Sequence, residues 1–390
     1  MLELTPLETL PPAVDKIAGQ NAPAAVKLMA ARGMSPLKPG DLLTALYQLA
    51  VSDDPTIKQA ASKTAVELPP KMLIGGLGEP LDIRVLDFFA RRVSQKPELL
   101  EIVLLNKATS DETYRHLATL CQENELEMIA RNEERLLRFP AIIAALYLNP
   151  KTRQSTAQRA LELAVRNNVR VDGIPAFEEA ERAIAESGAP TAAELARDDA
   201  AFKRAAEVAV DANAGLIMGA VDPEEEERRA AEEAAVAEAI AEGKIDPKDK
   251  AEVEEKKKRL EDLSPAAQIR IATLGNSFAR SILIRNKNKQ VAMACIKSPS
   301  LKETEVLHYA GNRSLDEDLI RYIAAKRQWT RHYGVKVQLC NNPKCPMSTA
   351  MGFLSHLRAP DLKALSRSKG IPSAVANAAK QLLQVRGGGA

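Results

Sequence analysis

The sequence predicts an all-α protein, organised as a degenerate α-solenoid of short helix pairs in two lobes that an Ala/Glu-rich acidic segment separates. Apolar residues make up 45% of the 390 residues and aromatic residues only 4%, so Ala and Leu supply most of the core. Both residues lose little side-chain entropy in a helix. No alternating run of β-branched and aromatic residues marks a strand. A helix-initiating turn also recurs along the chain, which is typical of stacked helix pairs.

The recurring turn joins the end of one apolar helical run to the start of the next. It begins at Asp, Asn or Ser, often before Pro, and a small or apolar residue follows three positions later. Asp, Asn and Ser side chains accept hydrogen bonds from the free N–H groups of a first helical turn, and Pro fits the first helical position. Asn149 and Asn342 are therefore each expected to cap the start of a helix. The turns, each with its third following residue, are Asp54 with Ile57, Asn149 with Thr152, Ser298 with Leu301 and Asn342 with Cys345, and, without Pro, Asn106 with Thr109, Asn276 with Ala279, Asn312 with Leu315 and Ser368 with Ile371.

One segment carries a resemblance to known repeats. Residues Val335–Leu354 read VKVQLCNNPKCPMSTAMGFL, and Val291–Ala310 and Ala144–Ala164 are similar. The pattern resembles the leucine-rich repeat variant and HEAT-like α-solenoids, in which an apolar helix ends at an Asn-Pro turn and a second helix follows. The resemblance covers most of 40–165 and 266–385. It implies a solenoid with a scaffold role, and it carries no catalytic residues.

The turns are unevenly spaced, by 22, 14, 30 and 26 residues in the C-terminal part. A regular repeat family would hold one period, so the array is expected to be degenerate. An ordinary helical bundle that uses the same capping chemistry is the alternative.

Charge divides the chain into three segments. Residues 1–170 carry 21 Lys and Arg against 20 Asp and Glu, residues 171–262 carry 13 against 26, and residues 263–390 carry 20 against 6. We therefore expect an N-terminal helical-repeat lobe at 1–170 and a basic C-terminal lobe at 263–386. The segment between them, 171–262, is expected to be an acidic linker, partly helical or disordered, because it offers few large apolar residues. Such asymmetry indicates an anionic partner or pairing within the chain.

The clearest functional signal is the basic and aromatic stretch Arg321–Lys336, RYIAAKRQWTRHYGVK. Tyr322, Lys326, Trp329 and Tyr333 recur at helical spacing, so one helix would present them on one face, and Gly334 would end that helix. Cations beside aromatic rings suit phosphates, acidic peptides and cation–π contacts. The alternative is that the aromatic residues pack into the core and the cations are only solvated. The partner-binding candidates are Arg321, Lys326, Arg327, Trp329, Arg331, Tyr333, Lys336 and Lys344.

Metal binding and catalysis find little support in the sequence. Cys340 and Cys345 lie between His332 and His356, but zinc needs four converging ligands, and both cysteines occupy apolar repeat positions typical of a core. None of the His residues lies in a nucleophile motif. The cluster Gly75–Gly78 lacks the Lys and Ser or Thr of a phosphate loop. We expect no enzyme activity, no metal and no cofactor.

Several features point to the cytoplasm. The chain has four cysteines, too few for a disulfide framework, and no apolar run long enough to span a membrane. Its first residues are acidic and do not resemble a signal peptide.

The sequence thus predicts a cytoplasmic scaffold that binds an acidic protein partner, or its own residues 171–262, through the basic C-terminal lobe. A nucleic-acid-binding HEAT-like protein that contacts phosphates through the same lobe is the alternative. A DNA-repair glycosylase on such a scaffold would need an acidic residue in an aromatic cleft, and the sequence indicates none.

Overall fold

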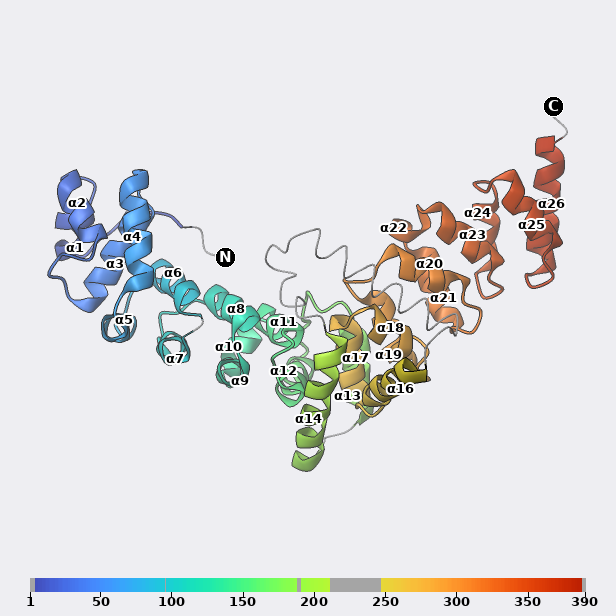
Figure 1. Cartoon of the computed structure of the whole chain (residues 1–390), viewed down its shortest axis with the longest axis horizontal. Coiled ribbons are helices and arrows are strands. Elements are labelled where there is room, and N and C mark those ends of the chain that lie inside the picture. The colour runs from blue at the N-terminus through green and yellow to red at the C-terminus, as the bar shows by residue number, and fades with distance from the viewer. Residues whose placement is uncertain (1–3, 95, 188–190, 211–246, 388–390) are drawn as a thin grey trace. The chain divides into compact units, whose positions relative to one another are not determined.

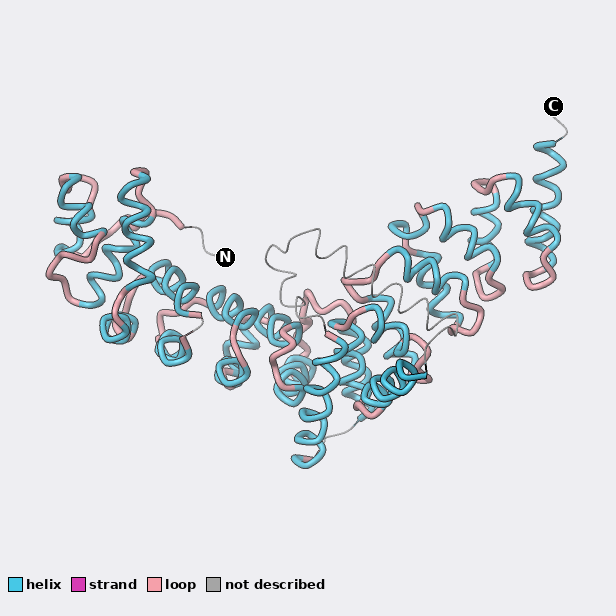
Figure 2. Tube along the Cα trace, viewed as in Figure 1, coloured by secondary structure: helices cyan, strands magenta, loops and turns pink. Residues whose placement is uncertain are grey.

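A computed structural model of the chain describes residues 4–94, 96–187, 191–210 and 247–387, and within these ranges it is helical with no strand (Figures 1 and 2). The all-α prediction is confirmed. The helices before residue 175 are α1 (Pro12–Ala18), α2 (Ala24–Ala31), α3 (Pro39–Ala50), α4 (Pro55–Glu67), α5 (Pro70–Leu77), α6 (Ile83–Val93), α7 (Pro97–Leu105), α8 (Asp111–Leu120), α9 (Glu123–Ala130), α10 (Glu133–Arg138), α11 (Ala141–Leu148) and α12 (Gln154–Arg166).

The later helices follow the same pattern of short elements with short connections. They are α13 (Phe177–Ser187), α14 (Ala192–Ala209), α16 (Pro247–Glu261), α17 (Pro265–Leu274), α18 (Ser277–Leu283), α19 (Lys289–Lys297), α20 (Glu303–Gly311), α21 (Glu317–Ala325), α22 (Arg327–Thr330), α23 (Tyr333–Asn341), α24 (Met347–Leu354), α25 (Ala359–Arg367) and α26 (Ser373–Gly387). The chain divides into two compact units, unit 1 (Met1–Ile174) and unit 2 (Pro175–Ala390).

Both units are stacks of helix pairs. In unit 1, α5, α7, α9 and α12 pack in sequence along one row, and α3, α6, α8 and α11 along the other (Figure 1). In unit 2, α17, α19 and α21 follow one another, as do α20, α23 and α25, and α26 packs on α24 and α25. Each helix therefore contacts mainly its neighbours in its own and the adjacent pair, which is the packing of an α-solenoid.

The small or apolar residue that follows each turn by three positions lies in the core, with one exception. Ile57, Thr109, Thr152, Ala279, Leu315, Cys345 and Ile371 are buried, and Leu301 is half-buried. Two of the expected caps also form. The Asp54 carboxylate accepts from the N–H groups of Thr56 and Ile57, and the Asn276 amide oxygen accepts from the N–H of Ala279 at 3.0 Å.

Asn149 and Asn342 do not cap the helices that follow them, so that expectation is wrong. The next helices begin after Arg153 and Pro346, and neither N-cap residue makes a side-chain cap bond. Each Asn instead ends the preceding helix, and both are buried, at 5% and 2% exposed. Their amide oxygens accept from the backbone N–H two residues on, at Lys151 and Lys344.

The amide nitrogens of these Asn residues join neighbouring repeats. Asn342 Nδ2 donates to the carbonyls of Ala310 at 2.8 Å and Asn312 at 3.2 Å, at the end of α20. Helix ends leave such carbonyls without helical partners. Asn149 Nδ2 likewise donates to the carbonyls of Ala118 and Cys121 at the end of α8. Asn106 Nδ2 donates to the carbonyls of Leu77 and Glu79 at the end of α5. The recurring Asn is therefore a contact between repeats more than a local cap.

The described ends of the acidic segment belong to unit 2. α13 packs on α17 and α19, α14 packs on α16 and α17, and Phe202 of α14 is buried. The buried Glu179 carboxylate lies 2.8 Å from Lys297 Nζ, and Gln290 donates to Glu186 at 3.0 Å. The acidic segment thus contacts the basic lobe at α19. Of the expected linker, 171–262, the described parts include helices that pack on unit 2, and residues 188–190 and 211–246 lie outside the described residues.

Candidate functional site

The basic and aromatic stretch does not form one helix. α21 ends at Ala325, the four-residue α22 follows Lys326, and α23 begins at Tyr333. Lys326 has an extended backbone, with φ −83° and ψ 109°, which interrupts the helical hydrogen bonds. The expected single face of aromatic and basic residues is therefore wrong.

Gly334 also differs from the expectation. It lies in the first turn of α23, where it was expected to end a helix. A Cβ atom at this position would come within 2.9 Å of Leu307 Cδ1 on α20. A larger residue here would displace the end of the Leu307 side chain, which is 36% exposed.

Three of the eight candidate residues are engaged within the chain. Arg321 pairs with Glu317 at 2.6 Å and with Asp318 at 3.4 Å. The Tyr333 hydroxyl donates to Asp361 and accepts from the Arg358 N–H at 2.9 Å. Lys344 donates to the Leu315 carbonyl. These side chains stabilise contacts within and between repeats, and they are poor candidates for binding a partner.

The other five candidates divide by exposure. Trp329 is buried, at 9% exposed, and Lys336 is half-buried. Lys326, Arg327 and Arg331 are exposed. None of these three cations forms an ion pair with a carboxylate of the described residues, although the Arg331 guanidinium also contacts the His332 ring at 3.1 Å.

Tyr322, Lys326 and Trp329 meet at a small hollow between α19, α21 and α22. The Tyr322 and Trp329 rings lie edge to face, with centroids 6.1 Å apart. Lys326 Nζ lies 4.9 Å and Lys297 Nζ 5.9 Å from the Tyr322 centroid. The hollow has a volume of about 190 Å³, and Gln328 and the segment Ile296–Pro299 complete its lining together with Leu301. We call it the α19–α22 hollow.

The carboxylates of the C-terminal lobe are all engaged. Residues 319–390 contain twelve Lys and Arg but only Asp361 as an acid, and Asp361 accepts from Tyr333. Within 263–318, Glu305 pairs with the buried Arg280, Asp316 and Asp318 pair with Lys289, Glu317 pairs with Arg321, and Glu303 lies 2.6 Å from His332 Nδ1. The lobe therefore has no free carboxylate among its described residues to neutralise its remaining cations.

The remaining cations are spread over α21–α26. We call the following exposed side chains, which form no ion pair with the described residues, the basic surface: Lys326, Arg327, Arg331, Arg358, Lys363, Arg367, Lys369 and Lys380. The Arg358 guanidinium lies 4.8 Å from the Tyr333 ring, which places the start of α25 beside the start of α23. The last five of these residues were missing from the sequence-based candidates, although the scarcity of acids after Asp318 signals them.

The possible zinc ligands do not converge. Cys340 and Cys345 are buried, as expected of core residues, and the Cys340 thiol contacts the Ala350 carbonyl at 3.6 Å. His332 is held by Glu303 on α20. In the part of the chain that the structure describes, no group of three or more His, Cys, Asp or Glu side chains could hold a metal ion.

The buried thiols make unfolding sensitive to alkaline pH. Burial raises the pKa of Cys121 and Cys340 to about 12 and that of Cys345 to about 11. An unfolded thiol ionises near pH 8.5, so above that pH the unfolded state holds fewer protons than the folded state. The free energy of unfolding should then fall by up to about 1.4 kcal/mol per pH unit for each thiol. Urea unfolding between about pH 8 and 10 measures this slope, and a Cys340→Ala/Cys345→Ala variant should show a smaller one. Equal slopes would contradict the prediction.

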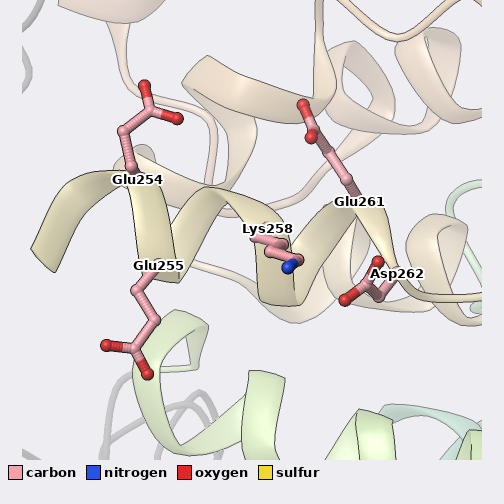
Figure 3. A pocket seen from close by; sticks show the side chains of 5 residues that line it. All are labelled: Glu254, Glu255, Lys258, Glu261 and Asp262. Atoms are coloured by element: carbon pink, nitrogen blue, oxygen red, sulfur yellow. The ribbon is translucent and has the colours of Figure 1, made fainter. Parts of the chain in front are cut away.

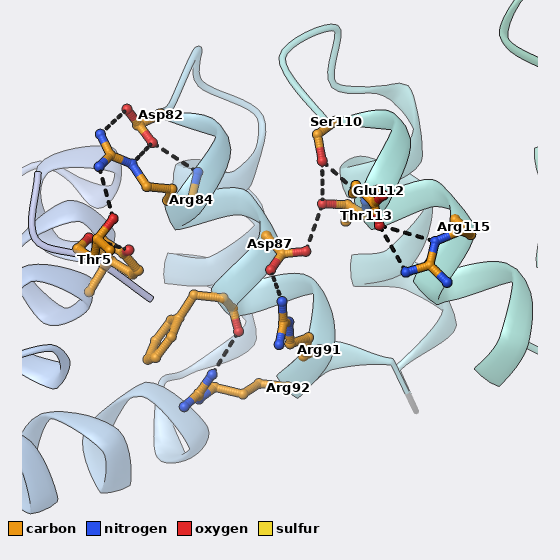
Figure 4. A network of polar contacts seen from close by, with 12 residues as sticks. Thr5, Asp82, Arg84, Asp87, Arg91, Arg92, Ser110, Glu112, Thr113 and Arg115 are labelled. Atoms are coloured by element: carbon orange, nitrogen blue, oxygen red, sulfur yellow. Dashed lines mark hydrogen bonds and ion pairs between the residues drawn. The ribbon is translucent and has the colours of Figure 1, made fainter. Parts of the chain in front are cut away.

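Unit 1 contains a buried carboxylate that acts as a structural contact (Figure 4). Asp87 of α6 is 1% exposed, and it accepts from Thr113 of α8 at 2.8 Å and pairs with Arg91. Both carboxylate oxygens are therefore engaged. The network joins adjacent repeats.

A second hollow lies on α16 and has a volume of about 570 Å³. Its lining is mainly acidic, from Glu254, Glu255, Lys258, Glu261 and Asp262. Figure 3 shows Glu254 and Glu255 projecting to opposite sides of the helix, so the carboxylates do not converge on a common point. Glu255 also pairs with Arg259 at 2.6 Å. This hollow has no arrangement that suits chemistry or a specific ligand.

No helix in the described ranges has the length and apolar character that a bilayer span requires. The chain matches no known protein-family model, no curated protein and no solved structure.

Proposed function

We propose that this chain is a non-enzymatic helical-repeat scaffold of the HEAT-like or leucine-rich-repeat-variant kind, which binds an acidic protein partner through the basic surface. The observation that supports the proposal most directly is that the carboxylates of unit 2 after residue 262 are engaged, whereas many of its exposed cations are not paired with the described residues. Every described carboxylate after residue 262 is engaged inside the lobe, while the exposed cations from Lys326 to Lys380 form no ion pair with the described residues. A positively charged surface attracts a negatively charged partner and raises the rate at which the two molecules associate.

Two features favour a protein over a nucleic acid. Met347 and Met351 lie one turn apart on α24 and are 51% and 41% exposed, so they offer flexible apolar contact beside the cations. The Phe, Tyr and Trp rings of the same lobe are buried or half-buried, and none of them is exposed for stacking on bases. Nucleic-acid binding would then depend on phosphate contacts alone.

Binding to polyglutamate and to a DNA duplex tests this proposal. The purified full-length protein should bind polyglutamate, and the affinity should fall steeply between about 50 and 200 mM salt because several charge contacts are screened together. Reversing three exposed cations, in an Arg327→Glu/Arg331→Glu/Lys363→Glu variant, should weaken binding by about tenfold or more. Fluorescence anisotropy of labelled polyglutamate measures both effects.

A matched control changes the same number of charges elsewhere. Lys58, Lys71 and Lys107 are exposed in unit 1 and form no ion pair with the described residues, so their reversal to Glu should affect binding much less. Equal weakening by both triple variants would contradict a specific basic surface. Tighter binding of the DNA duplex than of polyglutamate, by about tenfold or more, would favour the nucleic-acid alternative.

A further inference from the structure

The α19–α22 hollow is surrounded by donors that the chain does not use. The Tyr322 hydroxyl, the Gln328 amide and the Trp329 indole make no side-chain hydrogen bond with any described residue, and the Lys326 ammonium contacts only the Tyr322 ring. Buried Trp side chains usually find a partner for the indole N–H. Trp329 is 9% exposed and lines the hollow, and its indole nitrogen makes no hydrogen bond with any described residue.

Two lysines line the hollow, and only one of them forms no ion pair with the described residues. Lys297 is already neutralised by Glu179 at 2.8 Å and Glu178 at 3.7 Å. Lys326 is the one lining cation that forms no ion pair with the described residues. Its ammonium can form a charge-assisted hydrogen bond with one carboxylate.

The size of the hollow limits the ligand. Its volume of about 190 Å³ lies below the range of about 300–1,000 Å³ that is usual for small-molecule and cofactor sites. One side chain fits this space. Ile296, Pro299 and Leu301 are the apolar residues of the lining, and the exposed lining surface is mainly polar.

We propose that the α19–α22 hollow binds the carboxylate side chain of one Glu or Asp residue of the partner, with Lys326 as the counter-ion and the unused donors of Tyr322, Gln328 and Trp329 as hydrogen-bond partners. This inference rests on the proposed function, because it identifies the anchor point of an acidic protein on the basic surface. Anchor residues in well-packed pockets contribute much of the binding energy of an interface, and the surrounding charges contribute less.

Trp329 provides a direct readout, because it is the only Trp of the chain. A Trp-free peptide rich in Glu, titrated into the full-length protein at low salt, should change the Trp fluorescence in a saturable manner. The same peptide with Gln in place of Glu should not. A peptide with phosphoserine in place of Glu should bind no more tightly than the Glu peptide once the salt concentration is raised to about 150 mM.

Lys326→Met and Arg327→Met are the matched variants, since both remove one exposed cation and only Lys326 lines the hollow. Lys326→Met should weaken the Glu peptide about tenfold and abolish the fluorescence change, whereas Arg327→Met should weaken it no more than about twofold. Absence of any peptide binding by the unmodified protein would overturn the proposed function. Binding without a fluorescence change, equal effects of the two variants, or a clear preference for phosphoserine would overturn the carboxylate site and leave the proposed function standing.

Discussion

Replacing Glu305 with Ala is expected to lower the free energy of unfolding of unit 2 by about 3–5 kcal/mol, since it breaks a buried ion pair. Arg280 is 1% exposed, and its guanidinium contacts both Glu305 oxygens, at 2.9 and 2.8 Å. Burial alone would lower the pKa of Arg280, but the Glu305 carboxylate offsets this and the pKa is raised. Without Glu305, the cation keeps only the carbonyls of Gly275 and Ser300 in an environment that water does not reach.

Urea unfolding followed by circular dichroism measures this loss. Glu303→Ala is the control, because Glu303 lies on the same helix but is exposed and pairs only with His332, so its loss should cost no more than about 1 kcal/mol. An Arg280→Met/Glu305→Leu double variant should recover part of the stability, since apolar residues can replace a buried pair. Recovery should be incomplete, because the Gly275 and Ser300 carbonyls lose their donor. Similar midpoints for Glu305→Ala and Glu303→Ala would contradict this account.

Replacing Asn342 with Ala is expected to lower the free energy of unfolding by about 2–3 kcal/mol, because it leaves buried carbonyl oxygens without a donor. Asn342 Nδ2 donates to Ala310 and Asn312, and its oxygen accepts from the Lys344 N–H. A helix cap alone would contribute about 0.5–2 kcal/mol. We expect a larger loss of stability than for a cap because the Asn342 side chain also joins α20 to α23.

Asn312 provides a matched control at the same place in the repeat pattern. Its amide oxygen accepts from the Ser314 N–H and hydroxyl, but its amide nitrogen donates to no described residue. Asn312→Ala should therefore cost about 1 kcal/mol or less. The urea midpoints of the two variants decide between the interpretations. If both midpoints fall equally, the bond between repeats adds nothing to the local turn.

Local features of the sequence predicted the helices and their turns well. Ala and Leu favour helix, and the Asp54 and Asn276 side chains cap the helices that follow them. The residues three positions after the turns are buried or half-buried as expected. These features depend on the conformation of a few consecutive residues, so composition and short-range spacing contain the necessary information.

The break at Lys326 shows where local rules fail. Neither Pro nor Gly interrupts residues 321–333, and the helical spacing of the aromatic residues favoured one continuous helix. The structure instead ends α21 at Ala325 and turns Trp329 into the core on the short α22. Burial of the large indole contributes more than the few tenths of a kcal/mol by which propensities differ.

The candidate site, too, could be predicted only in part from the sequence. Lys326 and Trp329 could be selected from the sequence, but Lys297 belongs to an earlier helix and meets them only because α19 packs against α21. The charge count likewise showed an excess of cations, and only the structure distinguished Arg321 and Lys344, which are engaged, from Arg327 and Arg331, which form no ion pair with the described residues.

The sequence by itself therefore determined the helical content, the helix starts capped by Asp54 and Asn276 and the balance of charge in each segment, because backbone entropy, turn chemistry and net charge depend on nearby residues or on simple sums. The tertiary structure decided which carbonyls Asn149 and Asn342 contact, which cations find a carboxylate, and which side chains surround the α19–α22 hollow. The Asn side chains contact carbonyls 28–32 positions earlier in the chain, and Lys297 pairs with Glu179, which lies 118 positions earlier. Such contacts are set by how neighbouring helices pack and exclude water.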